Sequence, residues 1–243
     1  MGKLAFVAIL VLSLTLPVGG LALAMWPQSP LYGGTRVHGD RGLKLVALTF
    51  DDGPNRDGTL AIADAMESRG VRGTFFLVGR NVERDPATVA ELVRRGHVVG
   101  DHSWRHQKRD AIFDFDYAEA GKTQAAIKAA AGVCTALFRP PNGFHTPWQW
   151  QAVSDAGMQT VVWDVQTYDW ENPPASEIVD DVMAQVDPGS IILLHDGNDL
   201  DQGVARPETV KAVGEIIDRL SAEGYSFTTV DQLLGIPAYT ESC

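Results

Sequence analysis

Two short segments of the sequence combine carboxylates and histidines in a way that could bind a metal ion. Asp51 and Asp52 are adjacent in "LTFDDGPN", directly after an apolar run, and His102 and His106 lie four residues apart in "HSWRH". If "HSWRH" turned helically, both imidazoles would lie on one face, close enough to share an ion. One carboxylate would complete a site of two histidines and one carboxylate with a position open for water, which is typical of catalytic zinc.

The adjacent carboxylates Asp51 and Asp52 would repel each other at the end of an apolar segment unless a cation lay beside them. A divalent ion would remove that repulsion. One carboxylate could then bind the ion, while the other, kept ionised by the ion's charge, could accept a proton from water held there. The pattern therefore predicts two different roles for two neighbouring residues.

The segments that must position these groups alternate regularly between strand and helix. Strands are expected at residues 43–50, 74–79, 97–102, 135–139, 159–165, 190–195 and 225–230. Helices are expected at residues 58–70, 86–96, 117–131, 148–156, 176–186 and 207–224, with a short helix near Leu233. About seven such units predict an α/β fold with a parallel sheet, either open or closed into a barrel.

Ionisable side chains gather just after the predicted strands. They are Asp51, Asp52, His102, His106, Arg139, Asp164, Asp169, His195 and Asp196. In parallel α/β folds, binding and catalysis occur at the carboxyl ends of the strands. This placement predicts one site built from several strands.

The length, charge and N-terminus limit the possible classes of protein. A chain of 243 residues can form one domain with a sizeable core, and a net charge of −11 argues against nucleic acid as a partner. Residues 1–24 have a basic start, an apolar run and a small-x-small site ending at Ala24, which predicts a secretory signal peptide. The alternative is an uncleaved anchor, the only case in which membrane contact is expected. Residues 25–42 are predicted to be a linker or N-terminal arm.

Two cysteines, Cys134 and Cys243, leave two possibilities open. In an oxidising compartment they could form a disulfide that ties the C-terminal tail to the domain. Alternatively, Cys134 is a buried small apolar residue and Cys243 a loose tail residue.

Five motifs, in order, make the chain resemble the NodB-like polysaccharide deacetylases of carbohydrate esterase family 4. They are "TFDDGP", "HSWRH", "RPPNG", "QTYDW" and "LLH", and they span most of the chain after the N-terminal arm. The resemblance implies a distorted (β/α) barrel at residues 43–235, followed by a C-terminal tail at 236–243. It also implies a monomer acting on a glycan, with Zn²⁺, or another divalent ion such as Co²⁺, at the mouth of the barrel.

The resemblance assigns a role to each matching residue. The metal ligands would be Asp52, His102 and His106. Asp51 would be the general base, held by Arg139, and His195 the general acid, oriented by Asp169. The substrate-binding residues would be Asn142, through its backbone N–H, with Trp170, Leu193 and Pro140.

This sequence departs from the family pattern at two positions. Gln166 stands where the fourth motif usually begins with Asp, and Asn142 stands where the third motif often has an aromatic residue. Asp164 could compensate for Gln166 or be purely structural. Trp148 and Trp150 could stack on sugar rings or belong to a helix core.

Three functions remain possible from the sequence. The first is a secreted or extracytoplasmic hydrolase that removes acetyl groups from N-acetylglucosamine units of peptidoglycan or chitin-like oligomers, or O-acetyl groups from xylan. The second is a catalytically silent glycan-binding module. The third is a metal-dependent amidase that acts on a non-sugar amide.

Overall fold

The structure, a computed structural model, describes residues 19–20, 26–29, 34–198 and 205–243. The predicted signal peptide at residues 1–24 falls almost entirely outside these ranges, so it stays a prediction. Within the described ranges, no helix is both long enough and apolar enough to cross a membrane.

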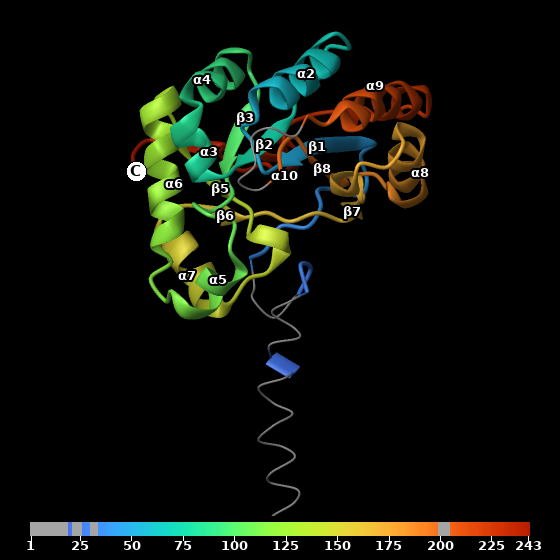
Figure 1. Cartoon of the computed structure of the whole chain (residues 1–243). Coiled ribbons are helices and arrows are strands. Elements are labelled where there is room, and N and C mark those ends of the chain that lie inside the picture. Colours follow the sequence, from blue (N-terminus) through green and yellow to red (C-terminus); the bar gives the residue numbers. More distant parts are fainter. Residues whose placement is uncertain (1–18, 21–25, 30–33, 199–204) are drawn as a thin grey trace, which may run out of the picture.

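One parallel sheet forms the centre of the molecule (Figure 1). Seven strands follow one another in the order β6-β5-β3-β2-β1-β8-β7, and β9 pairs with the start of β1. The strands are β1 (Leu45–Asp51), β2 (Thr74–Leu77), β3 (Val98–Asp101), β5 (Leu137–Phe138), β6 (Gln159–Thr160), β7 (Val165–Gln166), β8 (Ile191–His195) and β9 (Ser226–Phe227). The strongly apolar strands β1 and β8 lie side by side, as expected for strands buried on both faces.

Helices surround the sheet, as Figure 1 shows. They are α2 (Arg56–Glu67), α3 (Gly79–Arg84), α4 (Pro86–Arg94), α5 (Lys108–Phe113), α6 (Ala118–Ala131), α7 (Pro147–Asp155), α8 (Ala175–Gln185), α9 (Pro207–Ala222) and α10 (Val230–Leu234), with 3₁₀ turns η1 (Pro141–Gly143) and η2 (Asp169–Glu171). The longest, α9, buries Val213, Ile216 and Leu220 at helical spacing against the main core. The expected distorted barrel is confirmed, while α3 and α5 were not predicted.

The segment at residues 159–165, expected to be one strand, is instead divided between the two edges of the sheet. Gln159–Thr160 pairs with β5 at one edge, and Val165–Gln166 pairs with β8 at the other. Residues 161–164 cross the gap between those edges and so close the sheet into an incomplete barrel. The single-strand prediction was wrong because apolar periodicity does not reveal which neighbours a strand pairs with.

Both edges of the sheet are hydrogen-bonded to groups outside it. Arg36 forms a parallel bridge with Val161, donating its N–H to Thr160 O and accepting from Val162 N, both at 2.8 Å. At the other edge, the Gln185 side chain donates to Gln166 O at 2.8 Å and accepts from Gln166 N at 3.3 Å.

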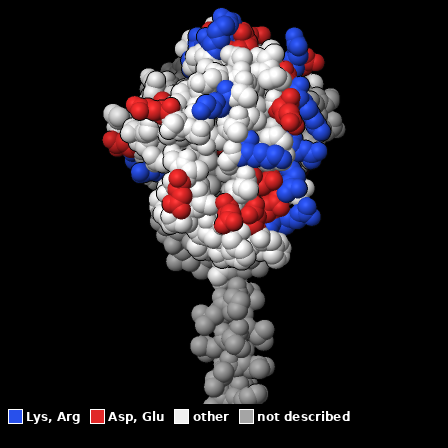
Figure 2. Space-filling model, turned by 90° about the vertical axis from the view of Figure 1, so that its left-hand side faces the viewer, with Lys and Arg blue, Asp and Glu red and all other residues white. Residues whose placement is uncertain are grey.

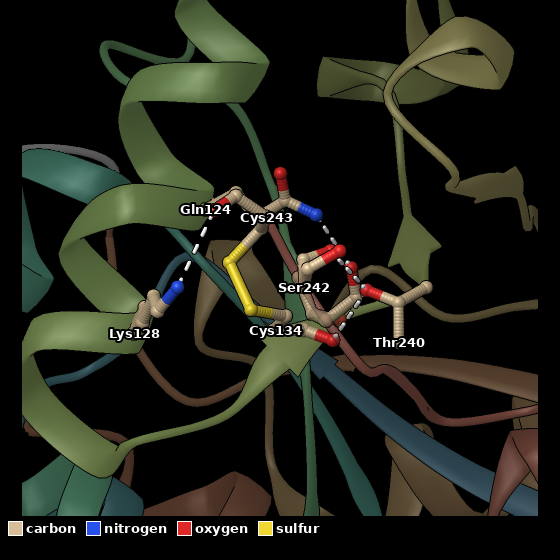
Figure 3. The surroundings of a disulfide bond; sticks show 7 residues. Gln124, Lys128, Cys134, Thr240, Ser242 and Cys243 are labelled. Atoms are coloured by element: carbon tan, nitrogen blue, oxygen red, sulfur yellow. Dashed lines mark hydrogen bonds between the residues drawn. A yellow bond between two sulfur atoms is a disulfide. The ribbon is translucent and has the colours of Figure 1, made fainter.

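The C-terminal tail is fixed to the domain (Figure 3). Its strand β10 (Tyr239–Thr240) pairs antiparallel with β4 (Cys134–Thr135), and Cys134 and Cys243 form a disulfide. The Lys128 amine of α6 also donates to Cys243 O at 3.3 Å. The predicted strand at 135–139 therefore divides into β4, which pairs with the tail, and β5, which joins the main sheet. Of the two alternatives for the cysteines, the structure shows the disulfide.

Charged side chains of both signs are intermixed on the face that carries α6 (Figure 2). On this face, therefore, the basic side chains do not form the continuous surface that a polyanion such as nucleic acid requires.

Candidate active site

Asp51 and Asp52 lie at the carboxyl end of the central strand β1. Asp51 is the last residue of the strand, and Asp52 adopts a left-handed conformation with φ of 78°. Neighbours in a regular strand face opposite sides, but this change of direction brings both carboxylates to the same side. One oxygen of each lies 3.6 Å from His102 Nε2.

Asp196, which follows β8, braces this turn. Its carboxylate accepts from Gly53 N at 3.1 Å and from the Thr59 hydroxyl, and its own N–H donates to Asp51 O at 3.1 Å. Burial, together with the nearby carboxylates, raises the pKa of Asp196 to about 7, although the Thr59 hydrogen bond opposes the shift. From the sequence, Asp196 was only one of the ionisable residues near the predicted strand ends.

His102 and His106 come together through a loop, not the helical turn that the sequence suggested. Ser103 and His106 both have positive φ, of 65° and 56°. Ser103 N donates to Asp101 Oδ1 at 2.7 Å, and His106 N donates to Ser103 Oγ at 3.0 Å. These local side-chain to backbone bonds replace helical ones, and the two imidazole rings still lie 4.9 Å apart.

Asp52, His102 and His106 form the group that could hold a metal ion among the residues that the structure describes. Their ligand atoms all lie within 4.8 Å of one another, and Asp52 Oδ1 is 3.6 Å and 3.4 Å from the Nε2 atoms of the two histidines. Asp52 Oδ1 is buried and receives no hydrogen bond in the described part of the chain. A buried carboxylate oxygen of this kind is expected to have a partner, and a cation would supply one.

The protonation of His102 also suits a metal ligand. Its Nδ1 lies 2.7 Å from Arg139 O, and since a carbonyl can only accept, Nδ1 carries the proton and Nε2 is left with a lone pair. Burial, followed by the charge of His106, lowers the pKa of His102 to about 3, so the ring is neutral. The residues present therefore fit a divalent metal.

Arg139 holds Asp51 from behind the site. Its fully buried guanidinium donates to Asp51 Oδ1 and to Thr49 Oγ1, both at 2.8 Å, and packs 4.1 Å from the centre of the Phe76 ring. Burial raises the pKa of Asp51, while the charge of Arg139 opposes the shift. Arg139 thus supplies the countercharge that keeps a buried carboxylate usable as a base.

Asp169 orients His195 in the same manner. Its Oδ1 lies 2.7 Å from His195 Nδ1, and its Oδ2 accepts from His195 N at 2.8 Å and from Thr209 Oγ1 at 3.0 Å. Burial alone would lower the pKa of His195, but the Asp169 carboxylate outweighs burial and raises it to about 9. The protonated imidazole can therefore donate a proton from Nε2.

A cavity of about 450 Å³ brings most of these groups together. It is lined by Pro27, Asp51, Asp52, His102, His106, Asn142, Trp163, Gln166, Trp170, Leu193, His195 and Asn198. Of the predicted site residues, Arg139, Asp169 and Pro140 do not line it. Arg139 and Asp169 instead contact Asp51 and His195, which do line it. Pro140 is buried directly before η1 and does not line the cavity, so its predicted substrate contact stays a prediction.

Sequence reasoning missed three wall residues, namely Pro27, Trp163 and Asn198. Trp163 could have been predicted, because it directly precedes Asp164, one of the ionisable residues near a predicted strand end. Pro27 carried no such indication because it lies in the N-terminal arm. Asn142 has a left-handed φ of 55°, and its side-chain amide lies 3.3 Å from His106 Nε2.

The structure shows where Asp164, Gln166 and Trp148 lie relative to the cavity. Asp164 accepts from Arg41 at 2.7 Å and from Ile191 N at 2.7 Å, which is a structural role away from the cavity. Gln166 does line the cavity and accepts from the Trp163 indole at 3.2 Å. Trp148 donates to Ala111 O at 2.7 Å and packs on Phe115, so it is not part of the cavity wall.

Comparison with known proteins agrees with this geometry. The sequence profile of the polysaccharide deacetylase family matches residues 38–161. A peptidoglycan-N-acetylglucosamine deacetylase of Bacillus cereus is 34% identical over 198 residues, covering 79% of this chain and 88% of that protein. A chitooligosaccharide deacetylase of Bradyrhizobium is 31% identical over 215 residues, covering 84% and 97%.

A solved peptidoglycan N-acetylglucosamine deacetylase, crystallised with a hydroxamate-type benzamide, superimposes with a TM-score of 0.80. The two sequences are 30% identical, and the superposition covers 85% of this chain and 95% of the other. The chain belongs to the polysaccharide deacetylase family. The expected family and enzyme class are thereby confirmed.

Proposed function

We propose that the protein is a metal-dependent deacetylase that removes acetyl groups from N-acetylglucosamine units of a polysaccharide. The observation that carries this proposal is one cavity holding a fitted metal-ligand set beside a buried base and a protonated histidine. Amide hydrolysis needs a nucleophile, a polarised carbonyl and a proton for the leaving nitrogen. The cavity wall contains a group suited to each need.

Asp51 would take a proton from the attacking water, because Arg139 fixes its carboxylate and leaves Oδ2 toward His102. A divalent ion held by Asp52, His102 and His106 would supply Lewis-acid polarisation of the acetyl carbonyl and make nearby water more acidic. His195 would donate a proton to the departing sugar nitrogen, giving the free amine and acetate. Asp169 keeps that histidine charged and correctly turned.

The acetyl group would be held by the remaining wall residues. Trp170 packs edge-to-face against His195 with ring centres 5.2 Å apart, and Leu193 is almost fully buried beside it. Together they would offer an apolar pocket for the methyl group. The Asn142 backbone N–H would donate to the developing oxyanion.

The substrate class rests on the relatives. Both deacetylases named above act, by their names, on glycans: one on peptidoglycan N-acetylglucosamine and the other on chitooligosaccharide. N-acetylglucosamine is the unit common to peptidoglycan and chitin, so it is the proposed target. O-acetyl groups on xylan and a non-sugar amide are the alternatives.

We infer an extracytoplasmic location for the enzyme. Two independent features support it: the signal-like sequence at residues 1–24 and the Cys134–Cys243 disulfide, which is favoured by an oxidising compartment.

Acetate release tests the proposal directly. Chitin oligomers, peptidoglycan and acetylxylan are each incubated with zinc-loaded and chelator-treated protein. The proposal expects acetate from the N-acetylglucosamine substrates, loss of activity with chelator, and recovery with Zn²⁺ or Co²⁺. Acetate from acetylxylan alone would favour the esterase alternative. No acetate from any substrate would refute the deacetylase function and leave a binding module.

A further inference from the structure

Residues 26–29, in the segment predicted to be a linker or N-terminal arm, reach the wall of the cavity. Residues 26–29 form a tight turn in which Ser29 N donates to Trp26 O at 3.1 Å. Pro27 stands at the second position of this turn, where its fixed φ is favoured. Pro27 is also one of the residues lining the cavity.

The turn contacts the domain at two points: Trp163, three residues before the fourth motif, and Gly143, the last residue of the third motif. Gln28 Nε2 donates to Trp163 O at 3.1 Å, so the turn is tied to the segment that crosses between the sheet edges. Pro27 packs so closely on Gly143 that a Cβ built on that glycine would lie 2.5 Å from Pro27 Cβ. This close approach needs a residue without a side chain at position 143.

The described part of the arm after residue 33 is also anchored to the domain. A Cβ built on Gly34 would lie 3.1 Å from the Trp150 ring, Arg36 bridges to Val161, and Arg41 donates to Asp164 at 2.7 Å. The position of Pro27 at the cavity is set by the contacts of its own turn with Trp163 and Gly143.

The chemistry of this wall suits an uncharged sugar ring. Pro27 shares the cavity with the indoles of Trp163 and Trp170 and with the neutral amides of Gln166 and Asn198. Apolar rings can pack on the C–H face of a pyranose, while amides can hydrogen-bond its hydroxyl and acetamido groups. Trp26, next to Pro27, leaves 63% of its large side chain exposed.

We propose that the turn at residues 26–29 is a sugar-contacting wall of the substrate cleft. Through Pro27 and Trp26 it binds a neutral N-acetylhexosamine unit beside the one being deacetylated. This inference rests on the proposed function. It predicts that the arm governs how strongly longer oligomers bind and leaves the chemical step unchanged.

The test compares the full chain with the double variant Trp26→Ala/Pro27→Ala. Kinetics are measured on N-acetylglucosamine oligomers from the dimer to the pentamer. For the pentamer, KM should rise roughly three- to tenfold while kcat changes by less than about twofold, as expected when one ring contact is lost away from the reacting bond. The conservative variant Trp26→Phe should retain most of the pentamer affinity.

Leu43→Ala is the matched control. It removes another exposed large apolar side chain, but from the opposite end of β1, away from the cavity. Its KM for every oligomer should equal that of the unaltered chain. Zinc content and melting temperature are recorded for all variants, so that loss of folding is recognised.

Calorimetric titration of chelator-treated protein with pentamer separates this inference from the function on which it rests. If the unaltered chain releases acetate but the double variant matches Leu43→Ala in KM and in affinity, the inference is overturned and the function stands. If no substrate releases acetate, the proposed deacetylase function is wrong. A lower affinity of the double variant for the pentamer would even then support a sugar contact at residues 26–29. Absence of any pentamer binding by the unaltered chain would also overturn the inference.

Discussion

The guanidinium of Arg139 and the carboxylate of Asp51 meet at 2.8 Å in the interior, where neither side chain is appreciably exposed. The same residue accepts from His102 Nδ1 through its backbone carbonyl. Arg139, which directly follows β5, thus positions both the proposed base and a proposed metal ligand. This arrangement links stability to catalysis, because Asp51 cannot lose Arg139 without becoming an unpaired buried charge.

Replacing Arg139 should therefore destabilise the protein strongly. Arg139→Gln is expected to lower the free energy of unfolding by about 3–5 kcal/mol, the usual cost of breaking a buried ion pair from one side. Chemical denaturation measures the effect. Arg69→Gln removes a solvent-exposed pair with Asp218 and should cost less than about 1 kcal/mol. Equal costs for the two variants would contradict the assigned role of Arg139.

The two adjacent aspartates should separate by metal content. Asp52→Ala removes the carboxylate whose Oδ1 lies within 3.6 Å of both histidine Nε2 atoms, and should abolish zinc binding. Asp51→Asn keeps the side-chain shape and should retain zinc while reducing kcat by at least about a hundredfold, as for loss of a general base. Elemental analysis and acetate assays measure the two effects. Equal loss of zinc in both variants would show that the division of roles is wrong.

The His195–Asp169 pair should make the stability of the metal-free protein depend on pH. His195 has a pKa of about 9 in the folded protein and about 6.5 when unfolded, so folding is favoured by its protonation. The stabilisation is complete below pH 6.5 and is lost as pH rises through 9, by roughly 3 kcal/mol in total. Denaturation of chelator-treated protein between pH 6 and 10 should show this fall, and His195→Gln should lack the part above about pH 8, where Asp196, with a pKa of about 7, is already ionised. If the stability of His195→Gln fell equally in that range, a group other than His195 would cause the pH dependence.

A side chain at position 53 should lower both the stability of the protein and its affinity for zinc. A Cβ at this position would lie 2.2 Å from Asp196 Oδ2 and would displace the carboxylate that braces the Asp51–Asp52 turn. Gly53→Ala is expected to cost about 1–3 kcal/mol of stability and to weaken zinc binding. Gly121→Ala in α6 meets nothing within 4 Å and should stabilise the helix by about 0.5–1 kcal/mol. An unchanged zinc affinity in Gly53→Ala would argue against the bracing role of Asp196.

The disulfide should contribute measurable stability. Cys134 and Cys243 close a loop across a sequence separation of 109 residues, and such a bond typically adds about 2–4 kcal/mol. Cys243→Ser and reduced unaltered protein should therefore show the same lowered melting temperature. Mass spectrometry after alkylation without reduction checks the bond itself. Two alkylated cysteines in that measurement would rule it out.

Much of the site could be predicted because its chemistry is local in sequence. Asp51 and His195 each end a strand, His102 and Arg139 each directly follow one, and a parallel sheet brings such ends together. The pairing of His195 with Asp169 was implied by the resemblance to the polysaccharide deacetylase family, and the structure shows the two side chains 2.7 Å apart. The features that could not be predicted depend on the local backbone conformation. Examples are the left-handed conformation of Asp52 and the loop between the two histidines.

Contacts between distant segments were also beyond the sequence. Nothing in the composition of the arm indicates that Pro27 would reach Gly143, since the fit depends on where two separately held turns meet. The segment at 159–165 was predicted to be one strand, but its switch between sheet edges is a property of the incomplete barrel as a whole. The disulfide was equally undetermined, because two cysteines alone do not define spatial proximity.

The caps on the two sheet edges have a consequence for solubility. An unpaired strand edge is a template onto which another chain can add, and this is a common start of aggregation. Here the Arg36 backbone occupies one edge and the Gln185 amide imitates a strand at the other, satisfying both the N–H and the C=O of Gln166. In the extracytoplasmic location that we propose, where cytoplasmic chaperones are absent, the protein would gain from exposing so little of its central sheet to its neighbours.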